Sequence, residues 1–274
     1  MEHHVARIDP APKLSMIKRM PQRYVSNKNE TVRMFESDFM ELFSHVHPVT
    51  PLVIYLPVIG YMLHLAVAQR ALPIMAAAGL FALGLLIWTL VEYTLHRYVF
   101  HYQPASGWGK RLHFLVHGVH HDYPQDASRL VMPPIVSVPL ALVFYGLFLV
   151  VFGRLAPAPF AGLLFGYLCY DLIHYATHHF SMKRGVWLWL KQYHMRHHYK
   201  DDHTGYGVSS PIWDFVFGTR TGDSAVPPEG AESDVIAGPA MKNSKSEARS
   251  SKQYQMFEEE NSKPASRLDH SSIW

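Results

Sequence analysis

The sequence predicts an all-α integral membrane protein with four transmembrane helices in two hairpins and a cytoplasmic helical cap that holds a histidine-rich dinuclear metal site. Three observations support this prediction. Four apolar stretches alternate with polar segments, nearly all lysines and arginines lie outside those stretches, and thirteen of the nineteen histidines fall between residues 96 and 203. The apolar stretches define the spans, the charges define their orientation, and the histidines define the site.

The chain divides into three parts by composition. Residues 1–32 form a polar N-terminal segment without the apolar core of a secretory signal, and residues 33–220 form the integral-membrane domain. Residues 221–274 are polar and poor in apolar side chains, which predicts a mostly disordered tail. Within residues 33–43, apolar and acidic side chains alternate at helical spacing, which indicates an amphipathic helix lying in the membrane interface or packed on the protein.

The spans are predicted from length and apolar content, since a membrane-crossing helix needs about 20 mostly apolar residues. The four stretches cover residues 52–68, 72–93, 135–152 and 160–173. The second is long enough, the first and third are adequate, and the fourth is marginal because Asp171 and His174 enter its end.

The positive charges orient these spans. Of 25 lysines and arginines, only Arg70 and Arg154 lie in the short loops within the two hairpins. Positive residues mark the cytoplasmic side, so we expect both termini and every histidine cluster to be cytoplasmic. The membrane would be the endoplasmic reticulum in a eukaryote or the inner membrane in a bacterium. The alternative, a buried helical bundle in a soluble protein, fits the charge asymmetry less well.

Composition also excludes several classes of function. The single cysteine, Cys169, rules out an intrachain disulfide and a cysteine-ligated iron–sulfur or zinc site. The net charge of +3, without a basic block interleaved with aromatic residues, argues against nucleic-acid binding.

The histidines cluster at spacings that suit metal ligation by imidazole. Residues three and four apart share a helix face, so each cluster except the first can present several rings together. His96 and His101 are five apart and converge only if a π-turn or a helix end intervenes. His113, His179 and His203 are weaker candidates. His113 could join the face of His117, but His179 is one step off the face of His174 and His178, and His203 lies in a polar loop. The clusters are His96 and His101; His117, His120 and His121; His174, His178 and His179; and His194, His197 and His198.

Two carboxylates lie close to the clusters in sequence. Glu92 is four residues before His96, and Asp171 is three before His174. We expect each carboxylate to accept an imidazole N–H and so to orient a ligand, because a carboxylate at the end of a span is costly unless it is paired.

Ligand type alone leaves the metal open among zinc, copper, iron and nickel. A zinc hydrolase is one alternative, but the chain lacks the His-Glu-x-x-His motif. A membrane metal transporter or metal-binding protein is another, yet transport favours ligands near mid-membrane, and only His64 lies deep in a span.

The histidine pattern and its flanking segments resemble the membrane-bound fatty acid hydroxylase superfamily, and within it the fatty acid 2-hydroxylases that act on sphingolipid acyl chains. The resemblance covers about residues 33–220. The segments that carry it are Glu92–His101, Leu112–His121, Ser128–Pro134, Gly166–Tyr175, His194–His198 and Gly205–Thr219.

The resemblance implies an iron-dependent oxygenase that uses dioxygen to hydroxylate a lipid acyl chain at its 2-position. The dinuclear metal centre itself would be the catalytic group, with no separate catalytic side chain, and zinc can replace iron in isolated material. A sterol or carotenoid hydroxylase or desaturase of the same superfamily is the alternative. The ligands it implies are His96, His101, His117, His120, His121, His174, His178, His194, His197 and His198.

The resemblance also bears on the electron source, because many eukaryotic members of the superfamily carry a fused N-terminal haem domain. The first 50 residues here do not resemble one. We therefore expect a separate donor, either a cytochrome b-type protein or a ferredoxin and reductase system.

Overall fold

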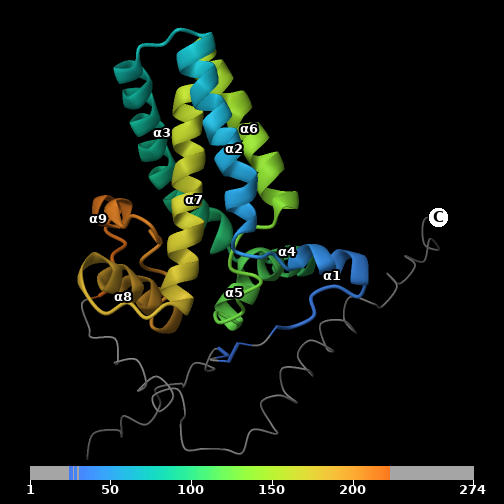
Figure 1. Ribbon diagram of the computed structural model, residues 1–274. Helices are drawn as coiled ribbons and strands as arrows, with labels where there is room; N and C mark the ends of the chain where they lie inside the picture. Colours follow the sequence, from blue (N-terminus) through green and yellow to red (C-terminus); the bar gives the residue numbers. More distant parts are fainter. Residues whose placement is uncertain (1–24, 27, 30, 223–274) are drawn as a thin grey trace, which may run out of the picture.

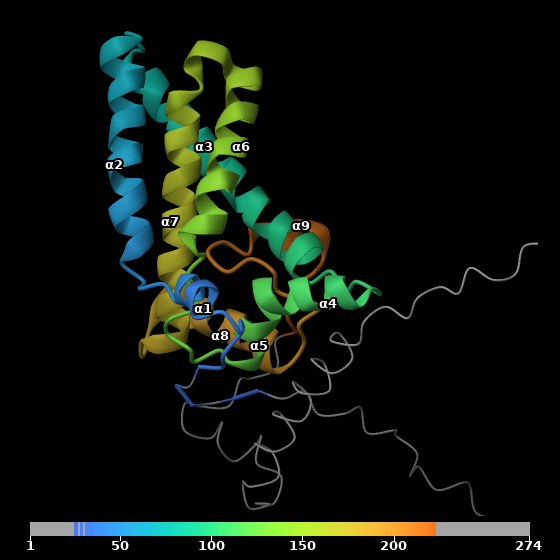
Figure 2. The ribbon, with the colours of Figure 1, turned by 90° about the vertical axis from the view of Figure 1, so that its right-hand side faces the viewer.

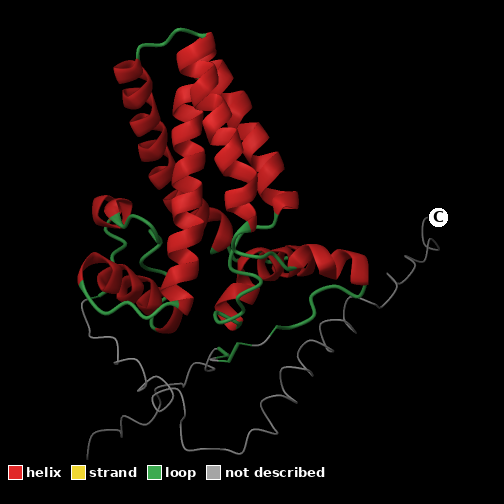
Figure 3. Ribbon diagram, viewed as in Figure 1, coloured by secondary structure: helices red, strands yellow, loops and turns green. Residues whose placement is uncertain are grey.

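The computed structural model describes residues 25–26, 28–29 and 31–222, and it is all-helical, with no strand in that part of the chain (Figure 3). Most of the predicted N-terminal segment and nearly all of the predicted tail lie outside the described residues. The α-helices are α1 (Asp38–Ser44), α2 (Thr50–His64), α3 (Ile74–Leu95), α4 (Gly107–His113), α5 (Val119–Asp122), α6 (Pro134–Phe152), α7 (Pro157–His179), α8 (Gly185–Tyr199) and α9 (Ile212–Phe217).

Four long helices, α2, α3, α6 and α7, run side by side as a bundle (Figures 1 and 2). Three segments are long and apolar enough to cross a membrane: Thr50–Gln69, Ile74–Phe100 and Pro134–Leu155. The fourth helix, α7, has 23 residues but is less apolar, and it packs against the other three. The structure thus confirms the all-helical class and three of the predicted spans by length and composition.

Prolines help to set where the bundle helices begin. Each of α2, α6 and α7 has a proline in its first two positions, at Pro51, Pro134 and Pro157. A proline is well tolerated there because the first N–H groups of a helix have no partner within the helix. Glycine ends α6: Gly153 has a φ of +52° and turns the chain towards α7.

Helices α3 and α7 pack backbone to backbone, which requires glycine. A Cβ atom on Gly84 would lie 1.8 Å from the carbonyl oxygen of Pro159, and one on Gly162 would lie 1.9 Å from that of Phe81. Small residues four apart permit this kind of close approach between membrane helices, and Gly162 and Gly166 have that spacing. The contact fixes the two helices that carry His96 and His174.

The remaining helices gather at one end of the bundle as a cap (Figure 1). The predicted amphipathic helix at 33–43 is shorter than expected, because only Asp38–Ser44 is helical. Its apolar residues Phe39 and Leu42 are about 70% exposed. The Glu41 carboxylate instead accepts hydrogen bonds from the backbone N–H of Met34 and the guanidinium of Arg129.

Candidate metal centre

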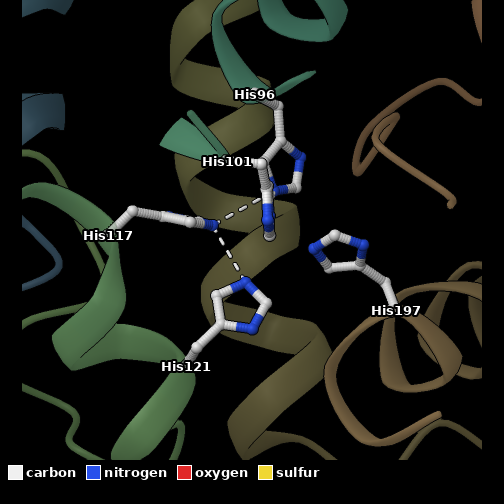
Figure 4. Close-up of side chains that lie close together, drawn as sticks. All are labelled: His96, His101, His117, His121 and His197. Carbon is white, nitrogen blue, oxygen red and sulfur yellow. Dashed lines mark hydrogen bonds between the residues drawn. The ribbon is translucent and has the colours of Figure 1, made fainter. Parts of the chain in front are cut away.

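All ten predicted histidines come together at the junction of the bundle and the cap, in two groups of five. In each group, one ring nitrogen per residue lies within 4.8 Å of the others. Group 1 consists of His96, His101, His117, His121 and His197 (Figure 4). Group 2 consists of His120, His174, His178, His194 and His198.

Adjacent histidines divide between the two groups. His120 belongs to group 2 and His121 to group 1, while His197 belongs to group 1 and His198 to group 2. Successive residues of a helix point about 100° apart, so α5 and α8 each present rings to both groups. Sequence spacing had placed each of these clusters on one shared face and had not shown this division.

The five-residue spacing of His96 and His101 is accommodated by a π-turn, as predicted. Residues His96–Phe100 form a π-helix, and the backbone N–H of His101 donates to the carbonyl of His96 at 3.1 Å. The extra residue in this turn brings the two Nε2 atoms to 3.2 Å. A second π-helix, Phe114–Gly118, leads into α5 and positions His117.

Two carbonyl groups fix the tautomers of two group 1 rings. His96 Nδ1 donates to the carbonyl of Tyr206 at 2.6 Å, and His197 Nδ1 donates to that of Thr204 at 2.7 Å. In a neutral ring this leaves Nε2 with a lone pair, directed towards the group. These two carbonyl partners could not be predicted from the sequence, because every residue carries the same backbone carbonyl.

The distances between ring nitrogens suit ligation of a metal ion. The Nε2 atoms of His117 and His121 are 3.0 Å apart in group 1, and those of His120 and His174 are 2.9 Å apart in group 2. Lone pairs that face each other at this distance repel unless a proton or a cation lies between them. Two nitrogens bound at about 2.1 Å and at right angles on one ion would be about 3.0 Å apart, so the residues fit a metal.

The environment keeps these imidazoles neutral, which is the form that binds metal. Among the rings outside the segment Ile74–Phe100 and helix α7, burial lowers the pKa of five well below the ordinary value, and neighbouring imidazoles lower it further. These are His117, His120, His121, His194 and His198.

Glu92 does not accept an imidazole N–H, contrary to expectation. Its Oε1 accepts the backbone N–H groups of Val208 at 2.6 Å and Ser209 at 2.7 Å, and its Oε2 accepts the Ser209 hydroxyl. These donors come from the loop that carries the Tyr206 carbonyl. The loop therefore lies between the carboxylate and the histidines, and it provides hydrogen-bond partners for both Glu92 and His96.

Asp171 also has no imidazole among its described contacts. Its carboxylate faces the Tyr167 hydroxyl and the backbone N–H of Met132, without reaching full hydrogen-bond geometry. Its side chain is 1% exposed. The expected hydrogen bond from His174 to Asp171 is therefore not formed, because both carboxylate oxygens and His174 Nδ1 lack a hydrogen-bond partner.

The three weaker histidine candidates lie outside both groups. His113 lines a cavity of about 290 Å³ beside group 1, together with His101, Gln103 and Asp202. His203 is exposed on the loop after α8. Asp214, which sequence reasoning missed, is fully buried and accepts the N–H groups of Tyr206 and Gly207 at 3.0 and 2.8 Å.

Comparison with known proteins identifies relatives of this chain. The family described as fatty acid hydroxylase matches residues 81–219. The dihydroceramide fatty acyl 2-hydroxylase FAH2 of Arabidopsis thaliana is 42% identical over 197 residues, covering 72% of this chain and 83% of the relative.

Two longer relatives are matched over part of their length. The ceramide very long chain fatty acid hydroxylase SCS7 of Saccharomyces cerevisiae is 46% identical, over 63% of this chain and 45% of the relative. The fatty acid 2-hydroxylase of Rattus norvegicus is 36% identical, over 72% of this chain and 58% of the relative. The solved structure of full-length Scs7p, with only the hydroxylase domain visible, superimposes with a TM-score of 0.64 at 42% identity, covering 69% of this chain and 72% of that one.

Proposed function

Because the chain belongs to the fatty acid hydroxylase family, we propose that it uses dioxygen to hydroxylate a lipid acyl chain at carbon 2, next to the carbonyl. The substrate class is a fatty acid or a sphingolipid N-acyl chain. Relatives named for 2-hydroxylation support this assignment. The observation that carries it is the pair of five-histidine groups at the end of an apolar helical bundle.

We assign one iron ion to each group, so that the ten imidazoles are the ligands; zinc can replace iron in isolated material. Iron bound there would supply the redox chemistry that activates dioxygen and oxidises an unactivated C–H bond. The side chains of group 2 are at most 5% exposed, so this part of the protein excludes bulk water. The carbonyls of Thr204 and Tyr206 hold two group 1 rings with Nε2 directed inwards.

We assign α7 as the fourth span, which completes two hairpins. The connections α2–α3 and α6–α7 lie at the same end of the bundle, where the Arg70 guanidinium donates to the carbonyl of Arg154. The histidine groups lie at the other end, as do most of the lysines and arginines among the described residues. The positive-inside rule supports a cytoplasmic site there, in the endoplasmic reticulum or a bacterial inner membrane.

The proposed reaction needs two partners. A separate donor, of cytochrome b type or a ferredoxin and reductase system, supplies the electrons. The acyl chain enters from the bilayer, between the spans and the cap. Apolar side chains such as Leu142 and Val150 of α6 are well exposed, which suits a surface in contact with lipid.

The direct test is product analysis. The full chain is expressed with a reductase system, and 2-hydroxy acyl lipids are measured by mass spectrometry. We expect them with the wild type and a loss of at least 100-fold with His120→Ala, which removes a group 2 imidazole.

The matched control is His203→Ala, because His203 lies outside both groups and its side chain is 68% exposed. It should retain activity within about twofold. Unchanged product with His120→Ala would overturn the assignment of the site. An oxidised sterol or carotenoid in place of 2-hydroxy acyl lipid would overturn the substrate class.

A further inference from the structure

The Glu92 carboxylate and His96 bind the same short loop from opposite sides. Glu92 accepts the N–H of Val208 at 2.6 Å, and the carbonyl of Tyr206, two residues earlier, accepts His96 Nδ1 at 2.6 Å. Glu92 and His96 are four residues apart on successive turns at the end of α3. The carboxylate therefore holds the backbone whose carbonyl sets the orientation of the ring.

The same order of groups recurs at α7. The Asp171 carboxylate lies near the backbone N–H of Met132, and His174 Nδ1 lies near the carbonyl of Leu130, again two residues earlier, but neither the carboxylate nor Nδ1 forms a hydrogen bond. These contacts are therefore looser than those at α3. Both carboxylates are nevertheless buried, with Glu92 3% and Asp171 1% exposed.

Each of the two loops comes from one half of the chain and lies beside a helix of the other half. The loop at 206–209 follows α8 and binds α3, whereas the loop at 130–132 follows α5 and faces α7. His96 belongs to group 1 and His174 to group 2, so each group has one such arrangement. Each half of the chain thus supplies a loop that lies beside a histidine of the other half.

We propose that Glu92 and Asp171 are equivalent positioning residues, each of which orients one histidine of one metal group through a loop from the opposite half of the chain. This inference rests on the proposed function, because it assumes that the groups bind metal. A carbonyl that accepts Nδ1–H directs the Nε2 lone pair to the metal, and loss of such an outer partner weakens metal affinity by about 10–100-fold. Each carboxylate should therefore affect the metal affinity of one group and leave the metal affinity of the other group unchanged.

The test measures metal affinity at each group in the purified full chain, with Co²⁺ as the probe and a competing chelator. We expect two Co²⁺ per wild-type chain. Glu92→Ala should weaken one of them about 10-fold or more, and Asp171→Ala should weaken the other. Glu92→Gln keeps an uncharged acceptor of the same shape and should weaken the same ion by a smaller factor, which maintains the test if the alanine variant does not fold.

Histidine variants assign each effect to its group. In a His101→Ala background, which weakens group 1, Asp171→Ala should still lower the affinity of the remaining ion and Glu92→Ala should not. The visible absorption of bound Co²⁺ should change in the same selective way. A role in stability alone would not produce this selectivity.

Glu41→Ala is the matched control. Glu41 also accepts two backbone N–H groups, from Met34 and Phe35, but neither residue is bonded to a histidine of the two groups. It should leave both Co²⁺ affinities unchanged. Equal weakening of both ions by Glu92→Ala, or no weakening by Glu92→Ala and Glu92→Gln, would overturn the inference. A wild type that binds no Co²⁺ would overturn the proposed function and this inference with it.

Discussion

The side chain of Glu41 holds a neighbouring chain segment on the cap. It accepts the backbone N–H groups of Met34 and Phe35, both at 2.9 Å, and a guanidinium N–H of Arg129 at 2.5 Å. Met34 in turn packs with Val119 of α5, next to His120. Although burial raises the pKa of Glu41, the backbone N–H groups and Arg129 outweigh it, so the pKa is lowered overall.

This lowered pKa predicts how stability depends on pH. Stabilisation by Glu41 should be complete above its unfolded-state pKa of about 4.3 and should be lost as the pH falls through the lower folded-state value. Glu41→Gln should lower the free energy of unfolding by about 1–3 kcal/mol at neutral pH. Denaturant unfolding in detergent at pH 7 and near pH 4 checks this. A difference between variant and wild type that grows on acidification would contradict it.

At the scale of elements, the crossing of α3 and α7 positions one histidine of each group, His96 of group 1 and His174 of group 2. The packing depends on the absence of a side chain at Gly162, where a Cβ would meet the backbone of Phe81. A backbone carbonyl cannot rotate away as the end of a flexible side chain can. Any larger residue therefore has to separate the two helices.

Gly162→Ala should destabilise the protein by about 3 kcal/mol or more, because it overpacks a contact between two backbones. It should also weaken Co²⁺ binding at both groups, since His96 directly follows α3 and His174 lies on α7. Thermal unfolding with and without Co²⁺ provides the measurement.

Gly146→Ala in α6 is the control for that variant, because a Cβ there meets nothing within 4 Å. Alanine is favoured over glycine inside a helix by up to about 1 kcal/mol, so this control should be neutral or slightly stabilising. Equal destabilisation by both substitutions would show that the close crossing is not the cause.

At the scale of the whole molecule, the proposed topology places the hairpin connections and the histidine groups on opposite sides of a membrane. Arg154 marks the connection between α6 and α7, and Lys183 marks the loop between α7 and α8. Both side chains are exposed. The four-span arrangement requires α7 to cross the membrane between them.

Cysteine labelling tests this arrangement in sealed vesicles. In a Cys169→Ala background, Arg154→Cys and Lys183→Cys should react with a membrane-impermeant maleimide from opposite sides. The Lys183→Cys variant should react from the cytoplasmic side. Labelling of both positions from the same side would exclude α7 as a span and leave the three apolar helices as the membrane part.

Much of the site was predictable from local spacing. The clusters at three- and four-residue intervals identified candidate ligands. The five-residue spacing of His96 and His101 required either a π-turn or a helix end, and the structure has the π-turn. The roles of the carboxylates were not predictable in the same way. Glu92 lies one helical turn from His96, yet its partners are at Val208 and Ser209, which are more than 110 residues away in the chain.

The sequence by itself determined the helical class, the apolar helices and the set of histidines, because hydrophobic length and helical periodicity are local properties. Only the tertiary structure decided that His120 and His121, or His197 and His198, belong to different groups. That division depends on where α5 and α8 lie in the cap at the end of the bundle. The tertiary structure also decided which carbonyls orient His96 and His197, because backbone groups are alike at every residue and only folding selects which of them meet a ring.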